Sequence, residues 1–247
     1  MTFCVGMRVE EGLVAIADTR ITTGTEVVMA RKVTTHSLNG HPFFIMTSGL
    51  RSVRDKALTY FEEVIEDLED GRREPFTKMY EAVNELAGQI RRVAKEDREY
   101  LESSRLSFNL NVLIGGRLEG DKEHKLYLLY PQGNWIDIGP GTPYSIIGAQ
   151  RYGKPILDRT LDYEDSLRHA LKVGVLAFDS TRISSSDVNF PIDVIVYKDA
   201  DRSIRETRYE KSDLEQMSSQ WQASLREALQ KLPDNWSEYA FTSPPKD

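Results

Sequence analysis

The stretch GLVAIADTR, at residues 12–20, decides how the start of the chain is interpreted. Its apolar run at residues 13–17 ends at Asp18, as a short buried strand does. Residues 3–9 alternate between apolar side chains and small or polar ones, which is the period of a β-strand. Because a turn-forming Glu-Gly pair separates the two segments, they predict two successive strands joined by a turn.

More strands are predicted before a pair of helices. Residues 27–34 are rich in β-branched side chains, and the Asn-Gly pair at residues 39–40 is a hairpin signal followed by a return strand at residues 42–47. Apolar residues then recur at helical spacing over residues 53–68 and again over residues 75–104.

The second half of the chain repeats this alternation. Strands are predicted between residues 106 and 148, helices between 153 and 178, and a hairpin between 192 and 208. An amphipathic helix over about residues 213–232 precedes a tail, residues 241–247, that we expect to be loose.

Runs of strands that alternate with runs of helices are typical of antiparallel sheets with segregated helices. We therefore predict an α+β fold, a four-layer αββα sandwich of two antiparallel sheets flanked by helices. No linker, repeat or low-complexity stretch interrupts the sequence, so residues 1–247 are predicted to form a single domain.

Composition and charge restrict the class of protein. Of the 247 residues, 40% are hydrophobic and 29% are charged, as in globular proteins. The net charge of −7 argues against binding to nucleic acid or to an anionic membrane surface. The sequence contains neither a membrane-spanning apolar run nor the features of a signal peptide, and we expect a cytoplasmic protein.

Metal and disulfide chemistry have little support in the sequence. The only cysteine, Cys4, excludes an intrachain disulfide and a metal site built on cysteine pairs, and we expect it to be a small buried residue. The four histidines lack metal-ligand spacing; they are His36, His41, His124 and His169. We predict neither a metal nor a cofactor.

Candidate chemistry lies in the Met-Thr start. A threonine hydroxyl is a poor nucleophile unless a base lies within hydrogen-bond reach. Removal of Met1, which a small second residue permits, would give Thr2 a free α-amine with an ordinary pKa of about 7.7–8.0. The amine could then act as the base for the hydroxyl of the same residue.

Two charged residues could assist Thr2. Asp18 ends a predicted strand, and Lys32 lies in the next strand-like stretch. A lysine beside Thr2 would favour loss of its protons, and an aspartate would hold that lysine charged. From the sequence alone, Asp18 and Lys32 could equally be an ordinary ion pair at a sheet edge.

The first part of the chain resembles the opening of proteasome β subunits. The residues that carry the resemblance are Thr2, the segment 12–20, Lys32 and the Ser-Gly pair at residues 48–49. The match extends in order and spacing through most of the chain. Further features are similar to the bacterial ancestral beta subunit family, Anbu. They are the Met-Thr start, the segments YGKPILDR (152–159), FDST (178–181) and PID (191–193), and the long C-terminal helix.

This resemblance implies roles for five residues. Thr2 would be the nucleophile and, through its amine, the base, while Asp18 and Lys32 would tune it. The backbone N–H of Gly49 would donate to the oxyanion, a contact worth roughly 2.7–4 kcal/mol in such sites. Asp179 would orient the amine end.

The resemblance also implies an activity and partners. The chain would be a self-compartmentalising threonine peptidase that acts on polypeptides or peptides and assembles as a homo-oligomer, in a ring or a spiral. The sequence leaves any unfoldase partner unidentified. Ile21, Met46 and Leu50, close to the expected substrate pocket, favour an apolar side chain before the cleaved bond.

Two departures from the family pattern keep other functions open. Ala149 and Arg182 stand where the family has serines that help to hold the N-terminus. One alternative is an amide hydrolase that acts on small amides rather than on polypeptides, since fold does not fix substrate. The other is a catalytically silent assembly subunit.

Overall fold

The computed structural model describes residues 2–23 and 26–242, with the side chains of residues 22–27 left aside. The chain divides into two compact units, Met1–Glu210 and Lys211–Asp247, which are considered separately. The single domain expected over residues 1–247 stays a prediction.

The first unit contains two five-stranded antiparallel sheets. Across one sheet the order is β10 (Tyr144–Gly148), β1 (Phe3–Val9), β2 (Gly12–Asp18), β11 (Ile192–Lys198) and β12 (Ser203–Tyr209). Across the other it is β5 (Val33–Leu38), β6 (His41–Gly49), β7 (Leu110–Gly116), β8 (Lys125–Leu129) and β9 (Trp135–Asp137). The predicted strand pair β1–β2 and the predicted hairpins β5–β6 and β11–β12 are confirmed.

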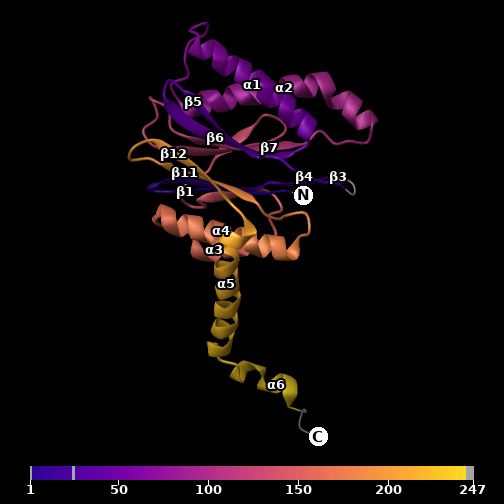
Figure 1. Cartoon of the computed structure of the whole chain (residues 1–247), viewed down its shortest axis with the longest axis vertical. Coiled ribbons are helices and arrows are strands. Elements are labelled where there is room, and N and C mark those ends of the chain that lie inside the picture. Colours follow the sequence, from indigo (N-terminus) through magenta and orange to yellow (C-terminus); the bar gives the residue numbers. More distant parts are fainter. Residues whose placement is uncertain (1, 24–25, 243–247) are drawn as a thin grey trace. The chain divides into compact units, whose positions relative to one another are not determined.

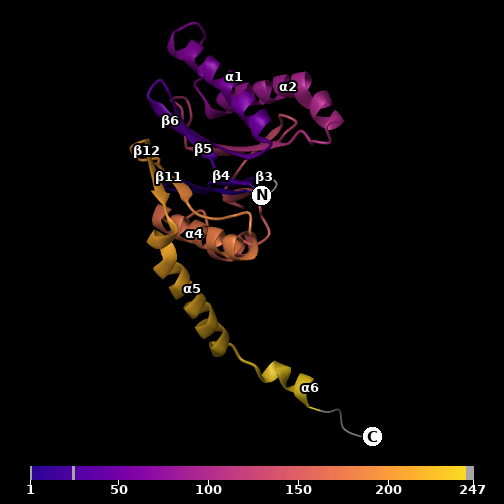
Figure 2. The ribbon, with the colours of Figure 1, turned by 45° about the vertical axis from the view of Figure 1, so that its right-hand side comes forward.

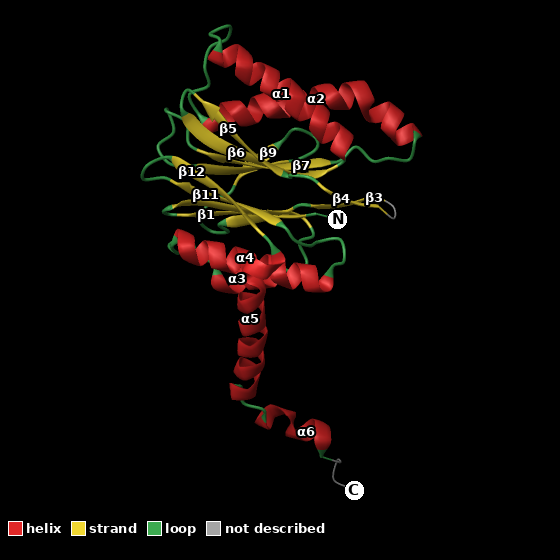
Figure 3. Cartoon of the chain, viewed as in Figure 1, coloured by secondary structure: helices red, strands yellow, loops and turns green. Residues whose placement is uncertain are grey.

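Helices cover the outer faces of the two stacked sheets (Figures 1 and 3). Helices α1 (Arg51–Glu69) and α2 (Met79–Ser103) lie over the sheet that contains β6. Helices α3 (Lys154–Thr160) and α4 (Leu167–Ser184) lie over the sheet that contains β1, and the turned view in Figure 2 shows the same order of layers. The predicted αββα sandwich is confirmed.

Strand β6 is buried on both faces. Successive side chains of a strand point to opposite faces, so Phe43 packs among the residues under α1 and α2, while Phe44 packs between the sheets. Both side chains are fully buried. Strand β6 is thereby fixed, and it carries Ser48 and Gly49 at its end.

The β-branched segment predicted as one strand over residues 27–34 is two strands. Strand β4 (Glu26–Met29) pairs with β3 (Arg20–Thr23) in a separate two-stranded sheet, and β5 begins only at Val33. Between them the backbone changes partners, because Ala30 N donates to Thr19 O and Thr47 N donates to Lys32 O. Strand propensity does not reveal such a change of partner.

The second predicted helix begins later than expected. The sequence placed its start at Pro75, whereas α2 begins at Met79. The Glu81 carboxylate accepts hydrogen bonds from Thr77 N at 2.7 Å and Lys78 N at 3.1 Å. This side-chain cap satisfies backbone donors that the helix leaves free, and so fixes its first residue.

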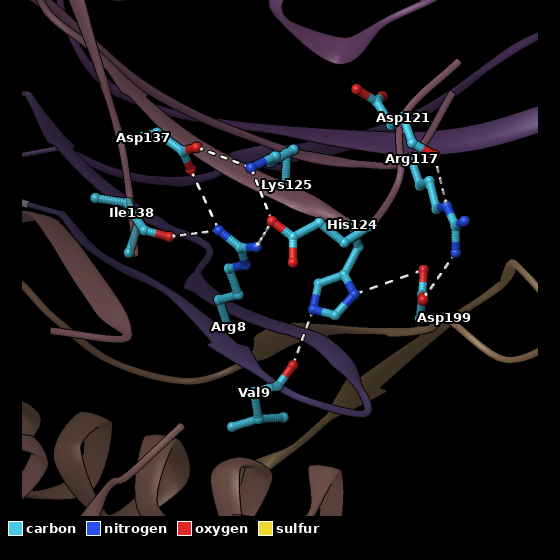
Figure 4. Close-up of polar contacts among 10 residues, drawn as sticks. Arg8, Val9, Arg117, Asp121, His124, Lys125, Asp137, Ile138 and Asp199 are labelled. Atoms are coloured by element: carbon cyan, nitrogen blue, oxygen red, sulfur yellow. Dashed lines mark hydrogen bonds and ion pairs between the residues drawn. The ribbon is translucent and has the colours of Figure 1, made fainter. Parts of the chain in front are cut away.

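Polar side chains tie the two sheets together at the far end of β1 (Figure 4). The buried Arg8 guanidinium pairs with Glu123 at 2.9 Å and donates to Ile138 O at 3.0 Å. His124 Nε2 lies 2.8 Å from Val9 O. Because Arg8 and Val9 belong to one sheet and their partners flank strands of the other, these contacts hold the sheets together at that end.

The second unit begins with helix α5 (Lys211–Lys231), close to the predicted range of 213–232. A short 3-10 turn (Asn235–Ser237) and α6 (Glu238–Phe241) follow. Of the tail expected over residues 241–247, residues 243–247 lie outside the described part of the chain. Within residues 2–23 and 26–242, none of the helices has the length and apolar character that a membrane span requires.

His36 should make the stability of the first unit depend on pH. It stacks on Phe43, and burial lowers the pKa of its imidazole from 6.5 to about 4. Protonation therefore favours the unfolded chain, so stability is complete above pH 6.5 and falls as the pH drops toward 4. We expect a contribution of about 3 kcal/mol to the free energy of unfolding to disappear over that interval.

Urea unfolding at several pH values tests this prediction. His36→Gln and His36→Phe should both lack this part of the pH dependence, and Phe also keeps the ring stacking. An unchanged slope in both variants would contradict the assignment to His36.

Candidate active site

The pairing of β1 with β2 places the start of the chain beside Asp18. Cys4 lies opposite Ala17 in this antiparallel pair, so Phe3 adjoins Asp18. Phe3 N donates to Asp18 Oδ1 at 2.8 Å, and the Asp18 side chain is fully buried. The carboxylate therefore lies directly behind the backbone of the first strand, next to Thr2.

Lys32 binds the same carboxylate oxygen. Its Nζ donates to Asp18 Oδ1 at 2.7 Å and to Arg20 O at 2.6 Å, and its side chain is 3% exposed. Burial raises the pKa of the Asp18 carboxyl, and the Lys32 ammonium opposes that rise. A buried pair of this kind fixes both partners, since loss of either leaves an uncompensated charge.

Thr2, Lys32 and Gly49 line one cavity of about 430 Å³. Gly49 has φ +146°, and a Cβ built there would lie 2.2 Å from Asn109 O, so only glycine fits without rearrangement. The structure thus brings three of the five predicted site residues to one cavity, with Asp18 bonded to Lys32.

Asp179, the fifth predicted residue, is not among the residues that line this cavity. It lies on α4, is 3% exposed, and forms an ion pair with Arg182 at 2.6 Å. The Arg182 guanidinium also lies over the Phe190 ring. The residue at the expected serine position therefore contacts Asp179.

The backbone at Ala149, which stands where the family pattern has a serine, holds Thr2 directly. Ala149 N donates to Thr2 O at 2.6 Å. Gly148 has φ +93°, and a Cβ there would lie 1.9 Å from Thr2 O. A backbone contact, which needs no serine hydroxyl, therefore fixes the carbonyl of Thr2.

The sequence analysis missed two arginines in the cavity. Arg51 and Arg54 lie in the first turn of α1 and line the cavity together with Ile21 and Leu50. Their spacing in the sequence was a signal, because residues three apart at the start of a helix lie on the same face. Met46, expected near the pocket, is instead fully buried between the sheets, so of the three apolar residues expected there only Ile21 and Leu50 reach the cavity.

A second cavity, of about 460 Å³, adjoins the first, and Ser48, Asn109 and Gly148 line both. Its other lining residues are mostly polar and include Asn111, Ser145, Gln150 and Lys154. Lys154 Nζ donates to Tyr144 OH and to Asp158 Oδ1, each at 2.9 Å. The two cavities provide room on either side of the shared residues.

Cys4 is a buried residue, as predicted. Its thiol is fully buried beneath the site, with Sγ 3.9 Å from Thr47 O, and burial raises its pKa. A thiol in that state is a poor nucleophile. Among the described residues, no group of three or more His, Cys, Asp or Glu side chains is placed to hold a metal ion.

Two stacked antiparallel sheets between helical layers, with a threonine entering the first strand, define the fold of the proteasome-type N-terminal nucleophile hydrolases. Anbu from Pseudomonas aeruginosa, described as a helical assembly, is 29% identical with a TM-score of 0.86, over 96% of this chain and 99% of that one. This structural match to an Anbu protein confirms the resemblance that the sequence predicted.

Two further structures agree. Anbu from Yersinia bercovieri is 28% identical with a TM-score of 0.84, over 94% of this chain and 98% of that one. A Gly-1 mutant of Anbu from Hyphomicrobium sp. strain MC1 is 29% identical with a TM-score of 0.85, over 95% of this chain and 99% of that one. Comparisons with protein-family models and with curated proteins find no match.

Gly148→Ala should destabilise the protein by displacing Thr2. The new Cβ would collide with Thr2 O, and a left-handed backbone alone costs about 1–2 kcal/mol for a residue with a side chain. We expect the free energy of unfolding to fall by at least about 2 kcal/mol in urea titrations. Gly141→Ala is the matched control, since a Cβ there has open space, and should change stability by less than about 0.5 kcal/mol. Equal stability of the two variants would contradict the tight contact.

Proposed function

We propose that the protein is a threonine peptidase that cleaves amide bonds through an acyl-enzyme on Thr2. The observation that carries the proposal is the shared cavity of Thr2, Lys32 and Gly49, with Asp18 bonded to Lys32. The proposal requires removal of Met1, which lies outside the described residues.

In the proposed reaction the Thr2 amine takes the proton of Thr2 Oγ, which attacks the substrate carbonyl carbon. The tetrahedral oxyanion accepts a hydrogen bond from Gly49 N. The amine proton passes to the leaving nitrogen as the C–N bond breaks, leaving an ester on Oγ. Water, deprotonated by the same amine, then attacks the ester carbonyl. The bond between that carbon and Oγ breaks, Thr2 Oγ takes the proton back from the amine, and the acid is released.

Lys32 and Asp18 are proposed to assist Thr2 through their charges. An ammonium beside Thr2 favours loss of its protons, and the Asp18 carboxylate keeps that ammonium charged and in place. Asp179 is assigned to orient the amine end, as the family resemblance implies.

We further propose a homo-oligomer, ring or spiral, that acts in the cytoplasm on polypeptides or peptides and binds neither nucleic acid nor membrane. Support comes from the Pseudomonas aeruginosa protein, which is described as a helical assembly. Ala149 and Arg182 favour a catalytically silent assembly subunit as the second candidate, because they replace the serines of the family pattern.

Thr2→Ala should abolish hydrolysis. In protein whose intact mass shows the loss of Met1, we expect turnover of fluorogenic peptides to fall at least about 1,000-fold, because the nucleophile and its hydroxyl proton are gone. Thr2→Ser should keep part of the activity. Thr160→Ala, at the exposed end of α3, is the control and should be unchanged.

Three outcomes distinguish the candidates. Peptide turnover that survives Thr2→Ala would contradict the proposal. Labelling of Thr2 by an electrophile without any peptide turnover would favour a hydrolase of small amides. Retention of Met1 in the mature protein would favour the silent assembly subunit.

The oligomer can be tested separately. Light scattering at micromolar concentration should give a mass well above the 28.2 kDa of one chain. A homogeneous species of one-chain mass would contradict the proposed assembly, whichever activity is found.

A further inference from the structure

The cavity beside Thr2 is positively charged. Lys32, Arg51 and Arg54 line it, and none of the described lining residues is an aspartate or a glutamate. Asp18, which does not line the cavity, forms an ion pair with Lys32 and so compensates its charge. The charge that faces the cavity therefore comes mainly from the two arginines in the first turn of α1.

One carboxylate positions both arginines. Asp55 Oδ1 accepts from Arg54 Nε at 2.8 Å and from Arg54 Nη2 at 2.5 Å, and Asp55 Oδ2 accepts from Arg51 Nε at 3.3 Å. Two guanidinium groups around one carboxylate leave a net charge of about +1. The arginines are thus oriented without being neutralised.

Arg54 keeps hydrogen-bonding capacity for a ligand. Its side chain is 14% exposed, and Nη1 also donates to Arg31 O at 3.3 Å. A guanidinium has five N–H donors, so these bonds leave others available. The first turn of α1 contains no acidic residue, and its N-terminus has no side-chain cap, which adds positive potential.

The cavity beside Thr2 differs in charge from the next one, of about 270 Å³, which begins past Arg54. That cavity carries both signs of charge, because carboxylates and cations line it together, namely Asp55, Glu62, Arg31, Lys32 and Arg54. Among the described residues, the cavity beside Thr2 is lined by cations without a carboxylate. A side chain held at Arg54 itself would meet the guanidinium first.

Building on the proposed function, we propose that Arg54, together with Arg51, selects substrates with an acidic side chain, glutamate or aspartate, at the residue whose carbonyl Thr2 attacks. A guanidinium binds a carboxylate through charge-assisted hydrogen bonds, which are stronger than neutral ones. Ile21 and Leu50 would contact the methylene groups of that side chain. The arginines are specificity residues and do not touch the reacting atoms.

Peptides that differ only at this residue test the proposal. With Glu in place of Gln, kcat/KM should be at least about tenfold higher, and the preference should weaken at high salt. Arg54→Gln should bring the Glu/Gln ratio close to one, and Arg51→Gln, the second variant, should lower it. Arg92→Gln, an exposed arginine on α2, is the control and should keep the ratio.

A binding measurement separates this proposal from the proposed function. Full-length Thr2→Ala should bind the Glu peptide at least about tenfold more tightly than the Gln peptide in fluorescence anisotropy. Tighter binding of the Glu peptide without turnover by the unmutated protein supports the proposed pocket for an acidic side chain and overturns the peptidase. Turnover with equal kcat/KM for Glu and Gln overturns the pocket alone. A ratio that survives in both arginine variants also overturns it.

Discussion

One carboxylate oxygen, Asp18 Oδ1, holds the site together. It accepts the backbone N–H of Phe3 and the ammonium of Lys32, so a single buried atom joins the start of β1, the end of β2 and the segment that enters β5. A buried charge that loses its partner costs several kcal/mol, which makes this arrangement difficult to distort. Thr2, one residue before Phe3, takes its position from that constraint.

Close backbone contacts complete the restraint. Thr2 O accepts from Ala149 N beneath Gly148, and Gly49 lies against Asn109 O, both in conformations that exclude a side chain. Strand β6, buried on both faces, carries Gly49 to this point. Donors fixed in this way need little reorganisation when charge develops, which is what stabilisation of an oxyanion requires. The backbone contact at Ala149 also explains how the chain start can be held where the family pattern has a serine.

The sequence predicted local features of the fold well. The Asn-Gly turn is encoded by its own residues, and φ is positive at both Asn39 and Gly40. Features that depend on distant partners were not predictable: the change of strand partner before Val33, and the start of α2, which Glu81 sets. For the site, the sequence nominated Lys32 and Asp18 but could not show that they meet, because only the packing of the sheets brings them to 2.7 Å.

Arg51 and Arg54 were missed for a different reason. Two arginines near the start of a helix do not by themselves indicate a binding site, and only the fold places that turn at the cavity of Thr2. Cations near a catalytic amine favour its uncharged form, and a bound carboxylate would offset them. In the proposed enzyme the charge that recruits an acidic side chain therefore also acts on the base. The choice of substrate and the basicity of the Thr2 amine are then coupled through the arginines in the first turn of α1. Lys32, by contrast, is held by Asp18, so its charge stays in place when substrate binds.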